Sequence, residues 1–192
     1  MDNRNGQAKT QFVASMFARV SRRYDFLNTV MTGGMHHHWR NMVAELAAQD
    51  LRGPALDVAT GTGDFALALA KYPTVGKIVG LDLVEEMVAL ARVKAQRRQL
   101  NGRVDFVQGD ALCLPFADNT FGCVTSGFAM RNVVDVAAAI AEMTRVVQPG
   151  GRVAILDIVP FENEGVLGKA ERCYFQRMVP ALGAVLTGDR EA

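Results

Sequence analysis

The stretch LDVATGTGDFA, residues 56–66, decides the fold of this chain. A short apolar run from Leu56 is followed at once by a turn that holds Gly61 and Gly63, and then by the helix-compatible sequence FALALAKY. Glycines let the backbone fold tightly and approach a ligand, because a side chain there would fill the space. The stretch therefore predicts a strand, a glycine turn and a helix in direct succession.

The same alternation continues along the chain. Further strands are expected at KIVGLDL, RVDFVQGD, TFGCVTSGF and RVAILDIV, which begin at residues 77, 103, 120 and 152. Helical patterns occupy residues 85–100 and 135–148, and the second is stopped by Pro149 and two glycines. Strands alternating with helices require right-handed crossovers and a parallel sheet covered on both faces. The predicted fold class is α/β, a doubly wound and mostly parallel sheet of the Rossmann-like type.

Helical sequence precedes and follows this sheet. Apolar residues at helical spacing predict one helix near residues 11–24 and a second near residues 39–46, with a Gly-Gly loop between them. We expect residues 1–50 to form a helical lid, residues 51–160 a ligand-binding core, and residues 161–192 a further helical segment on the substrate side. A chain of 192 residues, 49% of them hydrophobic, fits one domain that contains all three parts.

The charge balance and the cysteines indicate which partners and which compartment to expect. The formal net charge is +1, so no overall field would draw the chain to nucleic acid, and no nucleic-acid partner is expected. The cysteines at 113, 123 and 173 are odd in number and lack metal-ligand spacing, which favours a reducing compartment. No signal peptide or membrane span is predicted. We expect a cytoplasmic protein that can still touch the inner face of a membrane.

The glycine turn predicts a nucleoside-bearing cofactor. In an open parallel sheet the ligand lies outside the carboxyl ends of the strands. Asp82 ends the second strand, about 20 residues after the turn, where a carboxylate can accept two hydrogen bonds from a ribose diol. Gly61, Gly63 and Ala66 also satisfy the dinucleotide pattern GxGxxG/A, so an NAD-dependent oxidoreductase is an alternative.

Three features favour S-adenosylmethionine over a dinucleotide. Asp57 and Asp64 flank the turn, and their charge suits an ammonium and a sulfonium but would repel phosphates. Some fifty residues precede the first strand, and a dinucleotide domain usually lacks such an N-terminal lid. Asp110 ends the third strand, where its carboxylate could accept the adenine amino group. The alternative for these acids is that they are ordinary turn residues and helix caps.

Two longer motifs carry a family resemblance. YDFLNTVMTGGMHHHW, Tyr24 to Trp39, matches one signature, and RVVQPGGRVAIL, Arg145 to Leu156, matches another. On these motifs the chain resembles the class I S-adenosylmethionine-dependent methyltransferases, and among them the ubiquinone/menaquinone biosynthesis methyltransferases, which C-methylate a polyprenylated quinol. The second signature should close with Glu-x-Ser, but Asp157-Ile158-Val159 stands here. This departure concerns the identity of the substrate more than the chemistry. In the family, a further helix and the last two strands of the sheet follow the final segment; the sequence here lacks them, so we expect either a truncated chain or a sheet that is completed in another way.

The resemblance implies particular site residues. Its cofactor contacts fall on Thr62, Asp82, Asp110 and Ala111, and a further contact falls on Gly127, where only the backbone can interact. Thr60 replaces a family glycine and fits only if its φ is negative. With the turn residues, the predicted cofactor-binding set is Asp57, Gly61, Thr62, Gly63, Asp82, Asp110, Ala111 and Gly127.

Methyl transfer from a sulfonium is an in-line displacement that depends mainly on positioning. Arg131, in a segment similar to the family motif FGLRN, is expected to stabilise the phenolate oxygen; the alternative is a structural salt bridge. His36 and Tyr24 are expected to take or relay the quinol proton, with packing as the alternative, and Asp25 could orient one of them. The apolar stripes at residues 12–20 and 166–186 could line a groove for the polyprenyl tail, form a dimer interface or simply pack in the core.

Two further interpretations stay open, a methyltransferase for another small aromatic compound and a noncatalytic module of the same fold. No metal is expected. Consecutive residues on a helix point about 100° apart, so His36, His37 and His38 should not share one ion. His36 matches the signature and is expected to face the pocket, whereas His37 and His38 are expected to be solvated.

Overall fold

The computed structural model describes residues 3–50 and 52–158. In chain order its elements are α1 (Asn3–Val20), η1 (Ser21–Arg23), α2 (Tyr24–Thr32), α3 (Met35–Ala48), β1 (Gly53–Val58), α4 (Asp64–Leu69), β2 (Val75–Asp82), α5 (Glu85–Arg97), β3 (Val104–Gln108), β4 (Phe121–Gly127), η2 (Met130–Asn132), α6 (Val136–Val146) and β5 (Val147–Leu156). The expected helical segment at 161–192, including its apolar stripe, lies outside the described residues.

The five strands form one parallel sheet in the order β3-β2-β1-β4-β5. The chain winds outward from β1 to β3, and then returns to the other side of β1 and continues to β5. The carboxyl ends of β1 and β4 therefore meet where the winding direction reverses, which is where doubly wound proteins bind ligands. The predicted fold class is confirmed.

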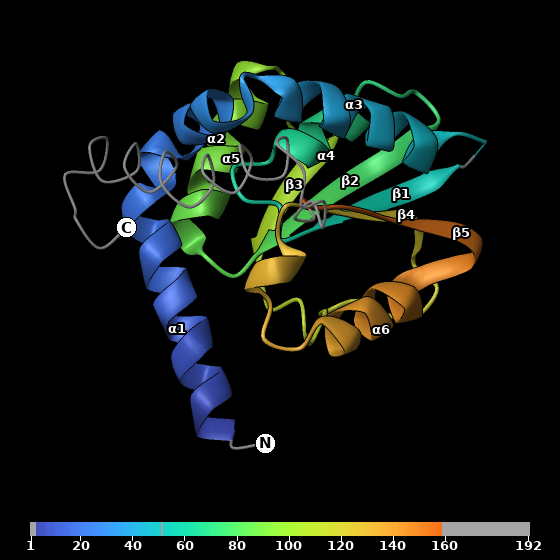
Figure 1. Cartoon of the computed structure of the whole chain (residues 1–192). Helices are drawn as coiled ribbons and strands as arrows, with labels where there is room; N and C mark the ends of the chain where they lie inside the picture. Colours follow the sequence, from blue (N-terminus) through green and yellow to red (C-terminus); the bar gives the residue numbers. More distant parts are fainter. Residues whose placement is uncertain (1–2, 51, 159–192) are drawn as a thin grey trace, which may run out of the picture.

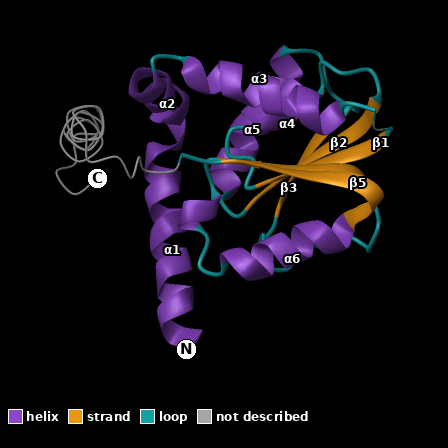
Figure 2. Ribbon diagram, turned by 45° about the vertical axis from the view of Figure 1, so that its right-hand side comes forward, coloured by secondary structure: helices purple, strands orange, loops and turns teal. Residues whose placement is uncertain are grey.

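Helices cover both faces of the sheet. Helices α3, α4 and α5 lie over one face and α6 lies over the other (Figures 1 and 2). Small side chains let α3 approach closely, and Ala44, Ala47 and Ala48 are all in the core. Because α3 belongs to the covering layer, "lid" hereafter denotes only α1, η1 and α2. Figure 1 shows α1 crossing beside the carboxyl ends of the strands.

The N-terminal region contains three α-helices where the sequence predicted two. A 3₁₀ turn at Ser21–Arg23 interrupts the first, and the Ser21 hydroxyl donates to the Ala18 carbonyl at 2.9 Å. The Gly-Gly loop is at the predicted place, because Gly33 and Gly34 both take positive φ between α2 and α3. The three histidines therefore start a helix.

Strand β5 begins five residues earlier than the run RVAILDIV predicted. Val147 pairs with Phe121, and Arg152 then pairs with Cys123, so the intervening residues loop out of the ladder. Gly150 has φ +78°, and a Cβ on Gly151 would lie 2.6 Å from the Gly122 carbonyl oxygen. The Pro-Gly-Gly sequence thus forms an irregularity within the strand instead of separating it from α6.

No helix in the described part of the chain has the length and apolar character that a membrane span requires.

Candidate functional site

A cavity opens at the carboxyl ends of the strands, beneath the lid. Its empty volume is about 830 Å³, including solvent at its mouth. Five of the predicted cofactor residues line it, namely Gly61, Asp82, Asp110, Ala111 and Gly127. The lid contributes Val13, Ala14, Phe17 and Tyr24, and most of the remaining lining is apolar.

Asp82 is held at the centre of this cavity wall by backbone donors. Its Oδ2 accepts from the Gly61 N–H at 2.7 Å and its Oδ1 accepts from the Val84 N–H at 3.0 Å. Burial raises the pKa of Asp82, while these N–H groups oppose the rise. A carboxylate has about four acceptor positions, so both oxygens retain capacity for hydroxyl donors.

The ends of the third and fourth strands also contribute to the cavity, from either side of β2 and β1. Asp110 is exposed, and its Oδ1 accepts from the Leu112 N–H at 2.9 Å, which fixes the loop that follows β3. Ala111 lines the cavity beside it, and Gly127 ends β4 across the opening. These residues come from separate strand ends, and the parallel sheet brings them to one edge.

Asp57 lies behind the glycine turn and not in the cavity. It is fully buried, and its Oδ2 accepts from the Thr60 hydroxyl at 2.5 Å and from the Ala66 N–H at 3.2 Å. Its Oδ1 accepts from the Thr125 hydroxyl at 2.9 Å. Burial raises its pKa to about 6, although these hydrogen bonds act in the opposite direction. The geometry corrects the expected cofactor contact: Asp57 anchors the turn to β4.

Thr60 and its neighbours show how the turn tolerates a threonine. As expected, Thr60 is not among the residues of positive φ, and the left-handed positions are Ala59, Gly61 and Gly63. The Thr60 hydroxyl is the donor to Asp57 described above, so this side chain contributes to the turn.

Thr62 and Gly63 also serve the turn from outside the cavity lining. The Thr62 hydroxyl is buried and donates to Asp25 Oδ1 at 2.5 Å, which connects the turn to the lid. A Cβ on Gly63 would lie 2.8 Å from Cζ of Phe106, so this glycine is needed for close packing against β3. Neither residue is among those that line the cavity, and their expected cofactor contacts stay predictions.

Of the three predicted catalytic residues, Tyr24 lines the cavity. Its ring packs edge-on against Phe17, with centroids 5.8 Å apart, and covers Gly61. The phenol therefore faces the part of the cavity nearest the glycine turn.

His36 does not line the cavity, so the prediction that it faces the pocket is wrong. It is buried between α2 and α3, where its Nε2 lies 3.3 Å from the Thr29 hydroxyl and its Nδ1 contacts the Arg40 guanidinium. Burial, and then the Arg40 charge, lower its pKa to about 4. A neutral, enclosed imidazole of this kind packs α2 of the lid against α3, and its expected part in proton transfer stays a prediction.

Arg131 lies beside the cavity in η2, next to the lining residue Asn132. Its guanidinium is half exposed and pairs with Asp157 Oδ1 at 3.2 Å, and its N–H donates to Asp157 Oδ2 at 3.4 Å. Arg131 is thus not among the lining residues in this conformation. The carboxylate that holds it stands where the family signature has glutamate.

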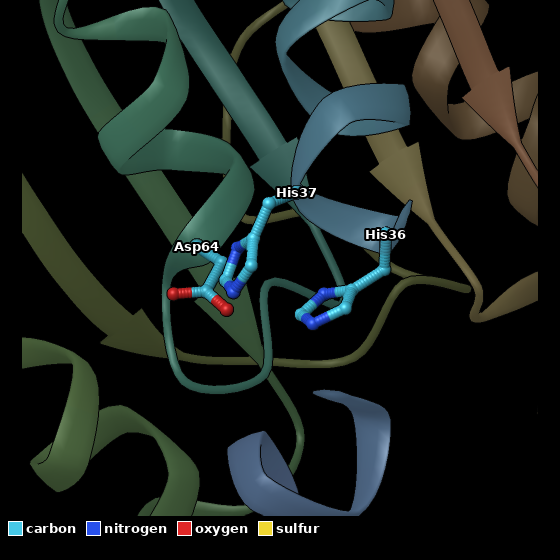
Figure 3. Close-up of side chains that lie close together, drawn as sticks. All are labelled: His36, His37 and Asp64. Atoms are coloured by element: carbon cyan, nitrogen blue, oxygen red, sulfur yellow. The ribbon is translucent and has the colours of Figure 1, made fainter. Parts of the chain in front are cut away.

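Figure 3 shows His36, His37 and Asp64 close together, with ligand atoms all within 4.8 Å of one another. The expectation that neighbouring histidines point apart is wrong for this pair, since their ring centroids lie 3.9 Å apart. The Asp64 carboxylate, however, already pairs with two cations, Lys94 Nζ at 2.7 Å and the Arg40 guanidinium at 3.8 Å. Their charge opposes a further cation, so we assign no metal to this cluster.

Sequence reasoning missed Lys94 and gave Asp25 only an orienting role. Lys94 Nζ binds Asp25 Oδ2 at 2.6 Å and thereby joins α5 to the lid. The available signal was that Lys94 interrupts the apolar stripe of α5, seven residues after Met87 and three after Ala91. A lysine in such a stripe is half-buried and requires a partner.

The fold and the site define a doubly wound α/β protein with a largely apolar cavity at its topological switch point, the place where proteins of this class bind ligands. The model of the ubiE/COQ5 methyltransferase family matches residues 5–192, and the chain belongs to this family. The resemblance inferred from the two signatures is confirmed.

Curated relatives agree with this family, and a solved structure agrees with the fold. The chain is 44% identical over 186 residues to a demethylmenaquinone methyltransferase of Deinococcus radiodurans, covering 97% of this chain and 76% of the relative. It is 38% identical to a ubiquinone/menaquinone biosynthesis C-methyltransferase of Dinoroseobacter shibae, covering 96% and 73%. A similar solved structure is the [4+2]-cyclase SpnF, with a TM-score of 0.69 and 28% identity over 80% of this chain and 62% of that one.

Proposed function

We propose that the protein transfers a methyl group from S-adenosylmethionine to a ring carbon of a polyprenyl quinol in menaquinone or ubiquinone biosynthesis. The observation that carries this proposal is the cavity, which has Asp82 and the glycine turn in one wall and apolar lid residues in another. The names of the relatives support a demethylmenaquinol or a ubiquinol precursor as substrate.

The residues present fit this cofactor better than a dinucleotide. Asp82 has acceptor capacity for a ribose diol and Asp110 for an adenine amino group. Among the described residues that line the cavity there is no lysine or arginine, whereas Asp82 and Asp110 are both acidic. That balance suits a ligand with an ammonium and a sulfonium and opposes a pyrophosphate. We assign the cofactor contacts to Gly61, Asp82, Asp110, Ala111 and the Gly127 backbone.

When bound, the cofactor supplies an electrophilic methyl group on a positive sulfur. The chain's contribution is to hold the quinol carbon about 3 to 3.5 Å from that methyl and to exclude water. The apolar lining favours a transition state in which phenolate and sulfonium charges cancel. Tyr24 lines the cavity and can relay the quinol proton to the solvent at the cavity mouth.

We assign Arg131 to the phenolate oxygen, with Asp157 holding the guanidinium at the cavity edge. Arg131→Ala should lower kcat by about 10²-fold, the loss typical of one donor to a developing oxyanion, with little change in S-adenosylhomocysteine affinity. Steady-state kinetics and calorimetry measure the two quantities. Arg97→Ala is the control. An equal loss of turnover and affinity in Arg131→Ala would contradict the assignment.

The lid also presents apolar side chains to solvent, including Phe12, 63% exposed, and Phe26, 56% exposed. We propose that this surface meets the membrane in which a polyprenyl quinol resides, and that the protein is otherwise cytoplasmic.

The decisive experiment is transfer of a radiolabelled methyl group to reduced demethylmenaquinone. Label in the quinone product supports the proposal. Label in other small phenols alone would favour a different aromatic substrate, an alternative motivated by Asp157 at the altered end of the second signature. The cyclase that shares this fold shows why the fold by itself does not settle the reaction.

A further inference from the structure

One hydrogen-bonded ionic network connects the lid to the glycine turn. Its members come from four places in the sequence: Asp25 in α2, Thr62 in the turn, Asp64 at the start of α4 and Lys94 in α5. Lys94 is the centre, because its Nζ lies 2.6 Å from Asp25 Oδ2, 2.7 Å from Asp64 Oδ1 and 2.8 Å from the Thr62 hydroxyl oxygen.

The network is saturated. An ammonium has three donors, and Lys94 has three acceptors within hydrogen-bond distance. The Thr62 hydroxyl, which accepts from Lys94, donates its own hydrogen to Asp25 Oδ1 at 2.5 Å. The Lys94 side chain is 22% exposed and that of Asp64 is 12% exposed, whereas that of Asp25 is 42% exposed. Charges that are bonded to several partners constrain geometry more than an isolated surface pair does.

The position of Asp25 links the network to the cavity. Asp25 is in the first turn of α2, directly after Tyr24, and Tyr24 lines the cavity and covers Gly61. Lys94 does not line the cavity itself. Fixing Asp25 against Thr62 therefore fixes the start of α2, and with it the Tyr24 ring, over the glycine turn.

We propose that Lys94 is a positioning residue that holds the lid closed over the cavity. The proposal rests on the proposed function, in that the closed lid retains the cofactor and aligns Tyr24. Without the ammonium, the carboxylates of Asp25 and Asp64 face one another across the vacated position and repel. Burial alone would raise the pKa of Asp64, yet Lys94 and Arg40 hold it below its ordinary value, so this carboxylate stays charged at neutral pH.

The first test measures how well the lid is protected from hydrogen exchange in the ligand-free protein. Lys94→Met should increase amide hydrogen exchange across Tyr24–Thr32 by about tenfold, with exchange in β1 and β2 unchanged as a check of the fold. Lys94→Arg, which keeps the charge, should restore much of the protection. Lys77→Met is the matched control, because Lys77 also binds an aspartate, Asp105 at 2.7 Å, away from the lid. Unchanged exchange in Lys94→Met would overturn the proposal.

The second test measures how fast the cavity releases its ligand. Stopped-flow fluorescence of Trp39, the single tryptophan, should show S-adenosylhomocysteine leaving Lys94→Met about tenfold faster than the wild type and Lys77→Met. Asp25→Asn should act through the same contact, so the double variant should lose less than the sum of the single effects. Additive effects would overturn the proposal. Failure of the wild type to bind S-adenosylhomocysteine would instead count against the proposed function, and the exchange data would still decide the role of Lys94.

Discussion

At the scale of single residues, Asp57 shows how one buried carboxylate shapes the glycine turn. Its two oxygens accept from Thr60, Ala66 and Thr125, so the strand before the turn, the turn, the helix after it and β4 are all connected. Burying an ionised carboxylate is costly even when it is hydrogen-bonded, which is why burial raises its pKa to about 6. The group that organises the turn therefore also makes stability depend on pH.

Asp57→Asn should remove that dependence. The folded-state pKa of about 6 is above the ordinary value of 3.8, so the native protein binds the extra proton and loses stability as pH rises from about 4 to about 6. Over that pH range the free energy of unfolding of the wild type should fall by up to about 3 kcal/mol relative to that of Asp57→Asn. The Thr125 hydroxyl can turn to the Leu56 carbonyl, 3.5 Å away, and accept from the new amide. Denaturant unfolding measured across this pH range makes the comparison, and parallel curves for the two proteins would contradict it.

At the scale of elements, two glycines surround the ring of Phe106 in β3. A Cβ on Gly63 would lie 2.8 Å from this ring and a Cβ on Gly80 would lie 2.5 Å from it. The absent side chains allow the glycine turn and β2 to pack directly on the ring. The glycine at 63 is thus explained by close approach between elements as well as by its φ of +85°.

Gly63→Ala should lower the free energy of unfolding by more than the strain of a left-handed backbone accounts for. Gly102 is the matched control, because its φ is +83° but a Cβ there would meet nothing within 4 Å. Gly102→Ala should destabilise by about 1 to 2 kcal/mol through its left-handed conformation. Gly63→Ala should add about 1 to 3 kcal/mol of overpacking against Phe106 and Ala91. Equal free energies of unfolding for the two variants would show that packing contributes nothing.

At the scale of the whole molecule, ligand binding and stability are coupled, because the cavity walls come from four strand ends and the lid. An unfolded chain has no such cavity, so a ligand that binds it stabilises the folded state.

S-adenosylhomocysteine at a hundred times its Kd should stabilise the protein by about 2.7 kcal/mol. For a chain of this length that corresponds to a rise in Tm of about 5 to 10 °C. Differential scanning fluorimetry measures the shift. NAD at the same concentration should leave Tm unchanged, since the described cavity lining carries no cation for a pyrophosphate. A shift with NAD alone would restore the oxidoreductase interpretation.

The sheet and the main part of the cavity wall follow from local sequence. Apolar runs, a glycine turn and Asp82 at a strand end have periods and spacings that only a strand-turn-helix succession satisfies, so the fold class and five cavity residues could be predicted. The family was also accessible, because the two signatures are long contiguous motifs.

The tertiary structure alone decided which polar residues of the motifs face the cavity. Asp57 and Asp82 both follow apolar strand residues, yet one points into the core and the other into the site. His36 and Tyr24 belong to one signature, but the break at Ser21–Arg23 and the Gly-Gly loop direct only Tyr24 over the turn. Lys94 acquires its role from Asp25, 69 residues earlier in the chain. Local patterns specify the path of the backbone, whereas the direction of a side chain depends on contacts between segments distant in sequence.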